Sequence, residues 1–178
     1  MLAEFAEVKI IVTEASKHFL DRSEAYNGPA HAEFASLDPP IPVLGDADEW
    51  EAWDAVGDPV LHIQLRKWAD LMLVAPLSAN TLAKLANGLC DNLVTCVARA
   101  WNFSEKKPFV VAPAMNTHMW EHPMTARHLS TLRDLGVVVV DPASKLLACG
   151  DTGIGALAEV GDICELARAC LSGDPAPR

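Results

Sequence analysis

Three segments of the chain carry side chains whose types and spacing suit chemistry on a small molecule. In the first, residues 73–81 (LVAPLSANT), the end of a strand runs into Ser78 and Asn80, residue types that favour the start of a helix. The unpaired backbone N–H groups of such a turn, together with the positive helix end, can bind a phosphate or another anion. An ordinary helix N-cap uses the same residues, so the local sequence leaves both interpretations open.

The second segment, residues 111–120 (VAPAMNTHMW), is a turn bracketed by prolines after another strand end. It presents Asn116, whose side chain offers both a hydrogen-bond donor and an acceptor. Met115, Met119 and Trp120 would form an apolar wall for a flat ligand, or they would pack into the core.

The third segment, residues 146–155 (LLACGDTGIG), has glycines in the order G-x-x-G-x-G. The dinucleotide fingerprint is G-x-G-x-x-G after a strand, and we expect no strand to run directly into this segment. Its glycine density predicts a mobile flap that carries Cys149, with a plain connector and an incidental thiol as the alternative.

The histidines have less specific surroundings. His62 lies in an apolar stretch, where a hydrogen-bonded structural histidine is common and a catalytic base is the alternative. His31 and His128 have no partner that the sequence identifies. His118 and His122 match the His-x-x-Glu-His pattern of inverted zinc peptidases, but Pro123 disfavours a helical His122 and no third ligand is evident. We therefore predict no metal site.

Hydrophobic patterning indicates the elements that position these residues. Near-continuous apolar runs predict buried strands, and Ala/Leu-rich or periodic stretches between them predict helices. Strands separated by helices indicate an α/β fold with a doubly wound parallel sheet, which binds ligands beyond the carboxyl ends of its strands. The expected strands are 8–13, 71–75, 109–112 and 137–140, and the expected helices are two within 77–101, broken near 88–92, then 125–135 and 163–171.

The remaining segments complete a single predicted domain over residues 1–178. Prolines and a glycine predict an irregular surface excursion at 21–45. Residues 46–53 begin with acidic residues, which predicts a short helix there. Residues 172–178 are expected to be a frayed tail.

Composition excludes several function classes. The chain has 178 residues, of which 14 are basic and 24 acidic, for a net charge of −10. Nucleic-acid binding needs a basic face, which this composition does not supply. No membrane span or secretory signal is expected, and the five cysteines are odd in number without a Cys-x-x-Cys pair. We therefore expect a soluble cytoplasmic protein with reduced thiols.

Five motifs in order give the sequence a family resemblance over nearly its whole length. They are 62–70 (HIQLRKWAD), 75–81 (APLSANT), 87–93 (NGLCDNL), 113–120 (PAMNTHMW) and 148–151 (ACGD). Together they resemble the phosphopantothenoylcysteine decarboxylases of the homo-oligomeric flavin-containing cysteine decarboxylase family. The resemblance implies a Rossmann-like flavoprotein subunit, usually in a homotrimer, with FMN near the subunit interface.

The implied reaction converts 4′-phospho-N-pantothenoylcysteine to 4′-phosphopantetheine on the route to coenzyme A. FMN oxidises the thiol carbon, which gives the carboxylate an electron sink, and reduced flavin later returns the hydride. In the family pattern, His62 is the base for the thiol step, Asn116 binds the substrate carboxylate and Cys149 is the proton donor. The other implied contacts are FMN with Thr13, Ala15, Phe19, Ser78, Ala79, Asn80, Thr81 and Ala114, and substrate with Met119, Leu146, Leu147 and Ala148.

One departure concerns the sheet. Members of the family open with a strand and a Gly-Ser-rich phosphate turn. In this chain, the first predicted strand, 8–13, aligns with the second strand of the family. The first strand of a doubly wound sheet is central, so without it we expect a gap within the sheet of about 10 Å, or two strand spacings. A non-enzyme alternative comes from relatives that inhibit a protein phosphatase or contribute to mixed trimers. Those relatives tend to lack a catalytic residue, whereas this chain keeps His62, Asn116 and Cys149.

Overall fold

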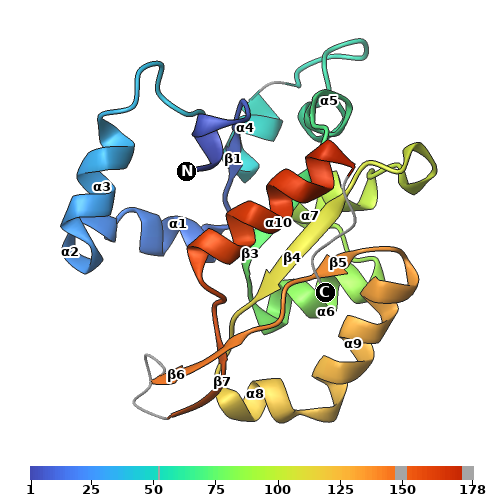
Figure 1. Cartoon of the computed structure of the whole chain (residues 1–178). Coiled ribbons are helices and arrows are strands. Elements are labelled where there is room, and N and C mark those ends of the chain that lie inside the picture. The colour runs from blue at the N-terminus through green and yellow to red at the C-terminus, as the bar shows by residue number, and fades with distance from the viewer. Residues whose placement is uncertain (52, 147–151, 174–178) are drawn as a thin grey trace.

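The structure, a computed structural model, describes residues 1–51, 53–146 and 152–173 (Figure 1). One or more helices separate each strand from the next between β1 and β5. In order, the elements are η1 (Leu2–Glu4), β1 (Ile10–Ile11), α1 (Glu14–Leu20), α2 (Ser23–Tyr26), α3 (Gly28–Ala35), β2 (Val43–Leu44), α4 (Asp46–Glu51), α5 (Leu61–Trp68), β3 (Met72–Leu77), α6 (Ala79–Asn87), α7 (Leu93–Arg99), η2 (Phe103–Glu105), β4 (Phe109–Pro113), α8 (Thr117–Glu121), α9 (Pro123–Asp134), β5 (Val138–Val139), β6 (Ala143–Leu146), β7 (Thr152–Ala156) and α10 (Val160–Ser172).

A parallel sheet in the order β3-β4-β5 forms the centre of the molecule. All five residues of β4 are buried, as expected for a strand with neighbours on both edges and helices on both faces. Its side chains alternate between two apolar clusters: Phe109 and Val111 belong to the larger one, and Ala112 belongs to the smaller one.

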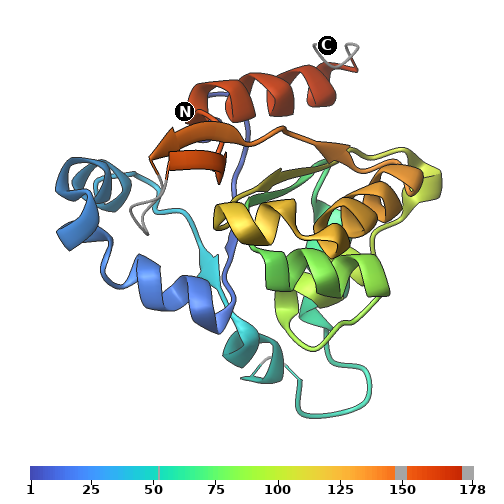
Figure 2. The same ribbon diagram turned by 90° about the horizontal axis from the view of Figure 1, so that it is seen from below.

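Helices cover the two faces of this sheet, as Figure 2 shows, with α10 on one side and α6 and α9 on the other. The larger cluster joins Leu82 of α6 and Leu132 of α9 to the strands, and each of these leucines is at most 2% exposed. Ile163 of α10 belongs to the smaller cluster on the opposite face. This arrangement is the predicted doubly wound α/β fold.

A second parallel pair, β1-β2, is separate from the main sheet in the described part of the chain. Ile11 of β1 and Leu44 of β2 nevertheless pack against the larger core cluster. On the facing edge of the main sheet, Ala75 and Pro76 of β3 are exposed, unlike any residue of β4. The sheet is thus divided between β1 and β3, which agrees with the predicted gap.

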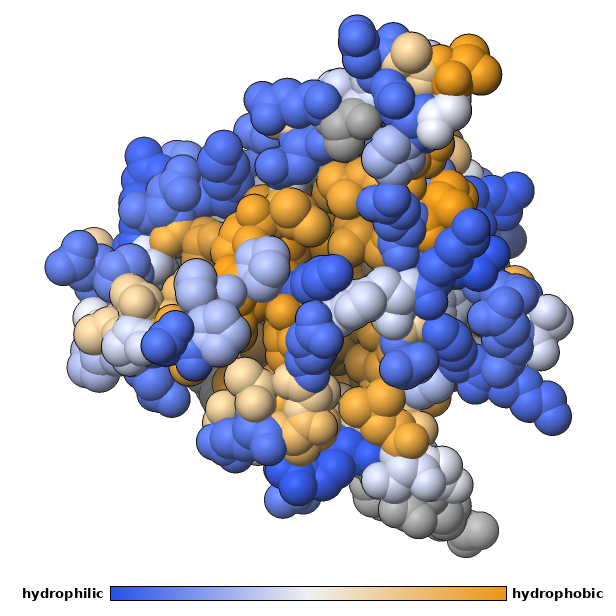
Figure 3. Space-filling view, turned by 90° about the horizontal axis from the view of Figure 1, so that it is seen from above, coloured by the Kyte–Doolittle hydropathy of each residue, from blue (hydrophilic) through white to orange (hydrophobic). Residues whose placement is uncertain are grey.

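The face at the amino ends of the strands is shown in Figure 3. Apolar side chains gather in a hollow at its centre, and polar side chains surround them.

The strand predictions were correct in place but not in number or length. Of the predicted strands, 8–13 is reduced to β1 and 137–140 to β5, whereas 71–75 is extended through Pro76 to Leu77 as β3. The sequence prediction missed β2, β6 and β7. Two-residue strands have no readable period, and Ala143–Leu146 lacks the β-branched and aromatic residues that mark strands.

The prediction of an irregular surface excursion at 21–45 was wrong for part of its length, because only residues 36–42 lack helix and strand over a longer stretch. The segment folds into α2, α3 and β2. Asn27 accepts a hydrogen bond from the Ala30 N–H, and Pro29 stands in the first turn of α3, where its missing N–H costs nothing. The glycine and proline therefore begin a helix here rather than interrupt one.

The other helix predictions were confirmed with small shifts. The break within 77–101 falls between α6 and α7, where Gly88 ends α6 in a left-handed conformation and Asn92 begins α7 with a capping box. The predicted tail at 172–178 was wrong at its start, because Ser172 is the last residue of α10. Residues 174–178 lie outside the described residues. No helix in the described ranges has the length and apolar character needed to cross a membrane.

Candidate active site

Three helices begin just after the carboxyl ends of parallel strands, and the sequence predicted the start of one of them, at Ser78. Thr13 follows β1 and caps α1, Ser78 follows β3 and caps α6, and Asn116 follows β4 and caps α8. The Ala114 N–H donates to the Leu77 carbonyl at 3.0 Å, which ties the ends of β3 and β4 together. The loops after β3 and β4 therefore form one edge of the site, where doubly wound sheets bind ligands.

Ser78 holds the start of α6. Its Oγ accepts a hydrogen bond from the Thr81 N–H at 3.2 Å and donates to Thr81 Oγ1 at 3.2 Å. The Ala79 and Asn80 amides belong to the first turn, whose N–H groups have no acceptor within the helix. These amides and the exposed Asn80 side chain form a neutral donor set that suits an anion.

We expect Ser78→Ala to lower the free energy of unfolding by about 1 kcal/mol, because the Thr81 N–H loses its acceptor. The measurement is urea denaturation followed by circular dichroism. Ser172→Ala is the control, since Ser172 Oγ donates to the Arg168 carbonyl near the end of α10 and satisfies no first-turn amide. Equal, negligible effects of the two substitutions would contradict the capping role of Ser78.

Asn116 is fixed by its own helix and by a neighbouring hairpin. Its Oδ1 accepts a hydrogen bond from the His118 N–H at 2.9 Å. The preceding residue, Met115, donates its N–H to the Gly155 carbonyl of β7 at 2.8 Å. A Cβ placed on Gly155 would lie 2.4 Å from the Met115 carbonyl oxygen, so only glycine permits this approach.

The hairpin corrects the prediction that no strand leads into the glycine-rich segment. β6 ends at Leu146, and the antiparallel strand β7 begins at Thr152 and includes Gly155. The expected substrate contact Leu146 thus has its backbone at the end of β6. Leu147, Ala148 and Cys149, predicted as substrate contacts and proton donor, lie outside the described residues.

His62 occupies a different part of the chain. It is on the first turn of α5, and its Nδ1 makes a hydrogen bond with Glu49 Oε1 of α4. Figure 1 places α5 at the opposite end of the molecule from α8 and the β6–β7 hairpin. One chain therefore brings Ser78, Ala114 and Asn116 together but does not bring His62 to them.

The other predicted contact residues have accessible positions. Ala15 and Phe19 are exposed on α1, and Met119 is exposed on α8. Met115 and Trp120 pack against the larger core cluster. Of the three residues of the predicted apolar wall, Met119 is therefore the one exposed to a ligand.

The remaining polar candidates have structural partners. Ser23 Oγ and His31 Nδ1 are hydrogen-bonded at 2.8 Å, and His128 lies on α9 beside Asn87. His122 has the extended conformation expected before Pro123 (φ −62°, ψ 133°), and its Nδ1 accepts from the Met124 N–H. Within the described ranges, no group of three or more His, Cys, Asp or Glu residues could hold a metal ion.

Two of the described cysteines lie in surroundings that disfavour the reactive thiolate. Cys90, Cys96, Cys164 and Cys170 are free thiols, and Cys90 is exposed in the loop between α6 and α7. Burial raises the pKa of the Cys96 thiol, and the nearby Glu49 carboxylate raises it further. Burial also raises the pKa of Cys170. Both effects favour the protonated thiol at neutral pH.

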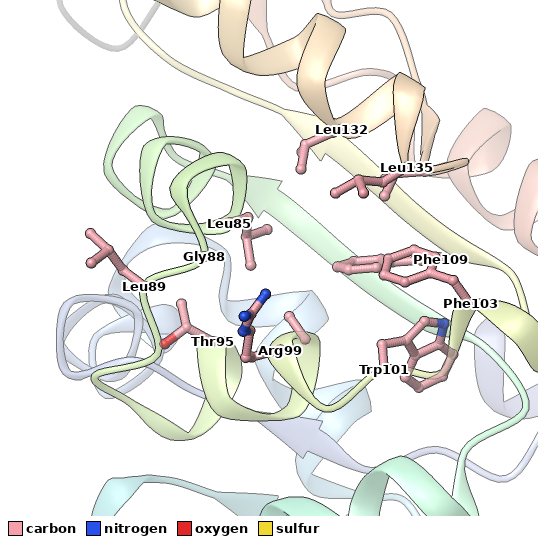
Figure 4. Close-up of a pocket in the computed structure, with 12 residues that line it drawn as sticks. Leu85, Gly88, Leu89, Thr95, Arg99, Trp101, Phe103, Phe109, Leu132 and Leu135 are labelled. Carbon is pink, nitrogen blue, oxygen red and sulfur yellow. The ribbon is translucent and has the colours of Figure 1, made fainter.

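An apolar cavity of about 210 Å³ lies between α6, α7, α9 and β4 (Figure 4). Phe109, the first residue of β4, lines it, so it opens at the amino end of that strand. The candidate site is at the carboxyl end of the same strand. The cavity is therefore not part of that site.

Sequence reasoning missed three residues around the predicted site. Glu49 is the partner of His62, Gly155 supports the Asn116 loop, and Thr117 Oγ1 is buried without a hydrogen-bond partner in the described part of the chain. Only Gly155 had a local signal, the dense glycines of its segment. The other two depend on contacts between elements.

The geometry has counterparts in known proteins. The chain matches the Flavoprotein family over residues 1–172. It belongs to that family. This flavoprotein is 55% identical over 157 residues to phosphopantothenoylcysteine decarboxylase of Oryza sativa subsp. japonica, an alignment that covers 88% of the chain and 65% of the rice protein. It is 51% identical to the Mus musculus phosphopantothenoylcysteine decarboxylase, over 93% of the chain and 74% of the mouse protein. The chain thus spans about two thirds to three quarters of these relatives.

Solved structures agree with the assignment. A cysteine-to-serine mutant of PPC decarboxylase complexed with pantothenoylaminoethenethiol superimposes with a TM-score of 0.83, at 50% identity, over 94% of this chain and 84% of that one. The FMN-binding protein AtHal3 superimposes with a TM-score of 0.81, at 48% identity, over 97% of this chain and 86% of that one.

The residues of this flavoprotein fit a flavin nucleotide. The first-turn amides of α6 and the Ser78 and Asn80 side chains suit a phosphate or the polar edge of a ring. The small side chains of Ala79 and Ala114 allow a flat ring to approach the backbone of both loops. Thr117 Oγ1, which is buried and has no hydrogen-bond partner among the described residues, is a further polar group beside Asn116.

Proposed function

We propose that this flavoprotein catalyses the FMN-dependent decarboxylation of 4′-phospho-N-pantothenoylcysteine to 4′-phosphopantetheine, a step of coenzyme A biosynthesis. The observation that carries the proposal is the Asn116 loop. It lies at the carboxyl end of β4, next to the Ser78 turn, and is fixed by the β6–β7 hairpin. Relatives more than half identical to the chain are named for this activity.

Each proposed residue has a separate task. Bound FMN supplies a reversible two-electron acceptor, so the decarboxylation has no net redox change. His62 accepts the proton of the substrate thiol, and the Asn116 amide holds the carboxylate until its carbon–carbon bond breaks and carbon dioxide leaves. Cys149 returns a proton to the product. Ser78 and its first-turn amides hold the flavin.

We expect Cys149→Ser to release carbon dioxide at a measurable rate but to accumulate an unsaturated thiol instead of 4′-phosphopantetheine. A serine hydroxyl is a much weaker acid than a thiol, so only the final proton transfer is impaired. A relative with a cysteine-to-serine substitution was obtained in complex with pantothenoylaminoethenethiol, which supports this expectation. Mass spectrometry of the products is the measurement, with Cys170→Ser as the control. Equal loss of carbon dioxide release and of 4′-phosphopantetheine formation would contradict a proton-donor role for Cys149.

The proposal includes a homotrimer in the cytoplasm. α5 and α8 lie at opposite ends of one chain, so His62 and Asn116 can serve one substrate only if they come from different copies. The free thiols of the described cysteines suit a reducing compartment. Analytical ultracentrifugation with FMN present measures the assembly state.

The test of the proposed function is carbon dioxide release from carboxyl-labelled 4′-phospho-N-pantothenoylcysteine, with FMN added to the purified chain. We expect release that depends on both FMN and the chain. Firm FMN binding without any release would contradict the proposed reaction, and failure to bind FMN would contradict the proposed cofactor.

A further inference from the structure

Glu49 lies against His62, and the contact joins two helices that are otherwise separated by a long connection. Glu49 Oε1 and His62 Nδ1 form the hydrogen bond. The Glu49 side chain is 17% exposed and the His62 side chain is 26% exposed. Because both groups are largely shielded from water, their interaction is less screened than a surface ion pair.

The helix that carries Glu49 is itself anchored at its start. Asp46 Oδ1 accepts a hydrogen bond from the Leu93 N–H of α7 at 2.7 Å, across 47 residues of sequence. Asp48 Oδ2 accepts one from the Gly45 N–H at 2.6 Å. Hydrogen bonds from backbone amides to carboxylates are among the stronger ones in proteins. They fix the first turn of α4, and α4 in turn presents Glu49 to α5.

The three carboxylates of this turn therefore have different roles. Asp46 and Asp48 bind backbone amides, whereas Glu49 binds a titratable side chain on another helix. Neither amide contact involves Glu49, so the anchoring of α4 does not depend on it.

The chemistry of the pair determines which ring nitrogen is available. An ionised carboxylate can only accept hydrogen bonds, so Nδ1 of a neutral His62 must carry the proton. Nε2 then keeps its lone pair. We propose that Glu49 is a positioning residue that fixes the Nδ1–H tautomer and the ring orientation of His62, so that Nε2 is the nitrogen that takes the substrate proton. This inference rests on the proposed function of His62.

The test of the tautomer uses two-bond ¹⁵N–¹H correlation spectra of histidine-labelled chain with FMN present. In the unsubstituted protein we expect His62 to carry its proton on Nδ1 at a pH where it is neutral. In Glu49→Gln the amide can donate as well as accept, so we expect a mixture of tautomers. Glu51→Gln is the matched control, because Glu51 is exposed on the same helix. An Nε2–H tautomer in the unsubstituted protein, or an unchanged tautomer in Glu49→Gln, would overturn the proposal.

The same variants provide a kinetic test. We expect Glu49→Gln to lower kcat by about 10- to 100-fold with little change in KM, the size of effect seen when a histidine that binds a metal loses the partner that orients its ring. Glu51→Gln should leave both constants unchanged. Equal effects of the two substitutions would overturn the positioning role. If the unsubstituted chain does not turn over substrate, the proposed function fails, while the tautomer spectra still decide the role of Glu49.

Discussion

His62→Asn is expected to lower the rate of carbon dioxide release by about 100- to 10,000-fold, the contribution usual for a general base. Asparagine keeps a polar side chain that can still donate to Glu49, but it has no nitrogen that accepts a proton at neutral pH. The His62 side chain is 26% exposed, so the substitution opens no cavity in the core. The measurement is the single-turnover rate with saturating FMN, alongside the thermal midpoint.

His128→Asn is the control for this prediction. His128 is a half-buried residue on α9 whose neighbour is Asn87, and nothing places it near the proposed chemistry. We expect its rate and its thermal midpoint to match those of the unsubstituted chain. Comparable rates for the His62 and His128 variants would exclude His62 as the base.

Gly155→Ala is expected to lower both stability and activity. The new Cβ would lie 2.4 Å from the Met115 carbonyl oxygen, and Gly155 has φ +135°, a conformation that side chains disfavour. Relieving the clash must move either β7 or the loop that carries Asn116. The backbone strain alone costs about 1–3 kcal/mol, and a 1 Å displacement of a catalytic group can cost about 100-fold in rate.

The readouts are urea denaturation and carbon dioxide release, with Gly161→Ala as the control. Gly161 lies in the first turn of α10, and a Cβ there would meet open space. Alanine favours a helix over glycine by up to about 1 kcal/mol, so this control should be neutral or slightly stabilising. If Gly155→Ala is as stable and active as the control, the hairpin does not hold the Asn116 loop.

Much of the sheet and the helix starts could be predicted from local sequence. The apolar run at β4 is buried by helices on both faces of the sheet, so its composition reports its environment. Asn116 was identified only as a polar residue of a turn, whereas Ser78 was identified as a cap because an N-cap depends on one side chain and the next turn. Such features need no knowledge of distant contacts.

The features that sequence reasoning missed depend on long-range contacts or weak patterns. Glu49 and His62 are 13 residues apart, and only the packing of α4 on α5 brings them together. Ala143–Leu146 becomes a strand because it pairs with Thr152–Ala156, although its own composition does not favour one. The separation of His62 from Asn116 follows from the relative placement of α5 and α8, which no motif encodes.

The most direct test of the central claim is the mass of the product formed anaerobically from 4′-phospho-N-pantothenoylcysteine by the chain loaded with FMN. The proposed reaction has no net redox change, so it needs neither oxygen nor an added reductant. We predict complete conversion to 4′-phosphopantetheine, lighter than the substrate by one carbon dioxide. Recovery of unchanged substrate from a chain that has bound FMN would contradict the account.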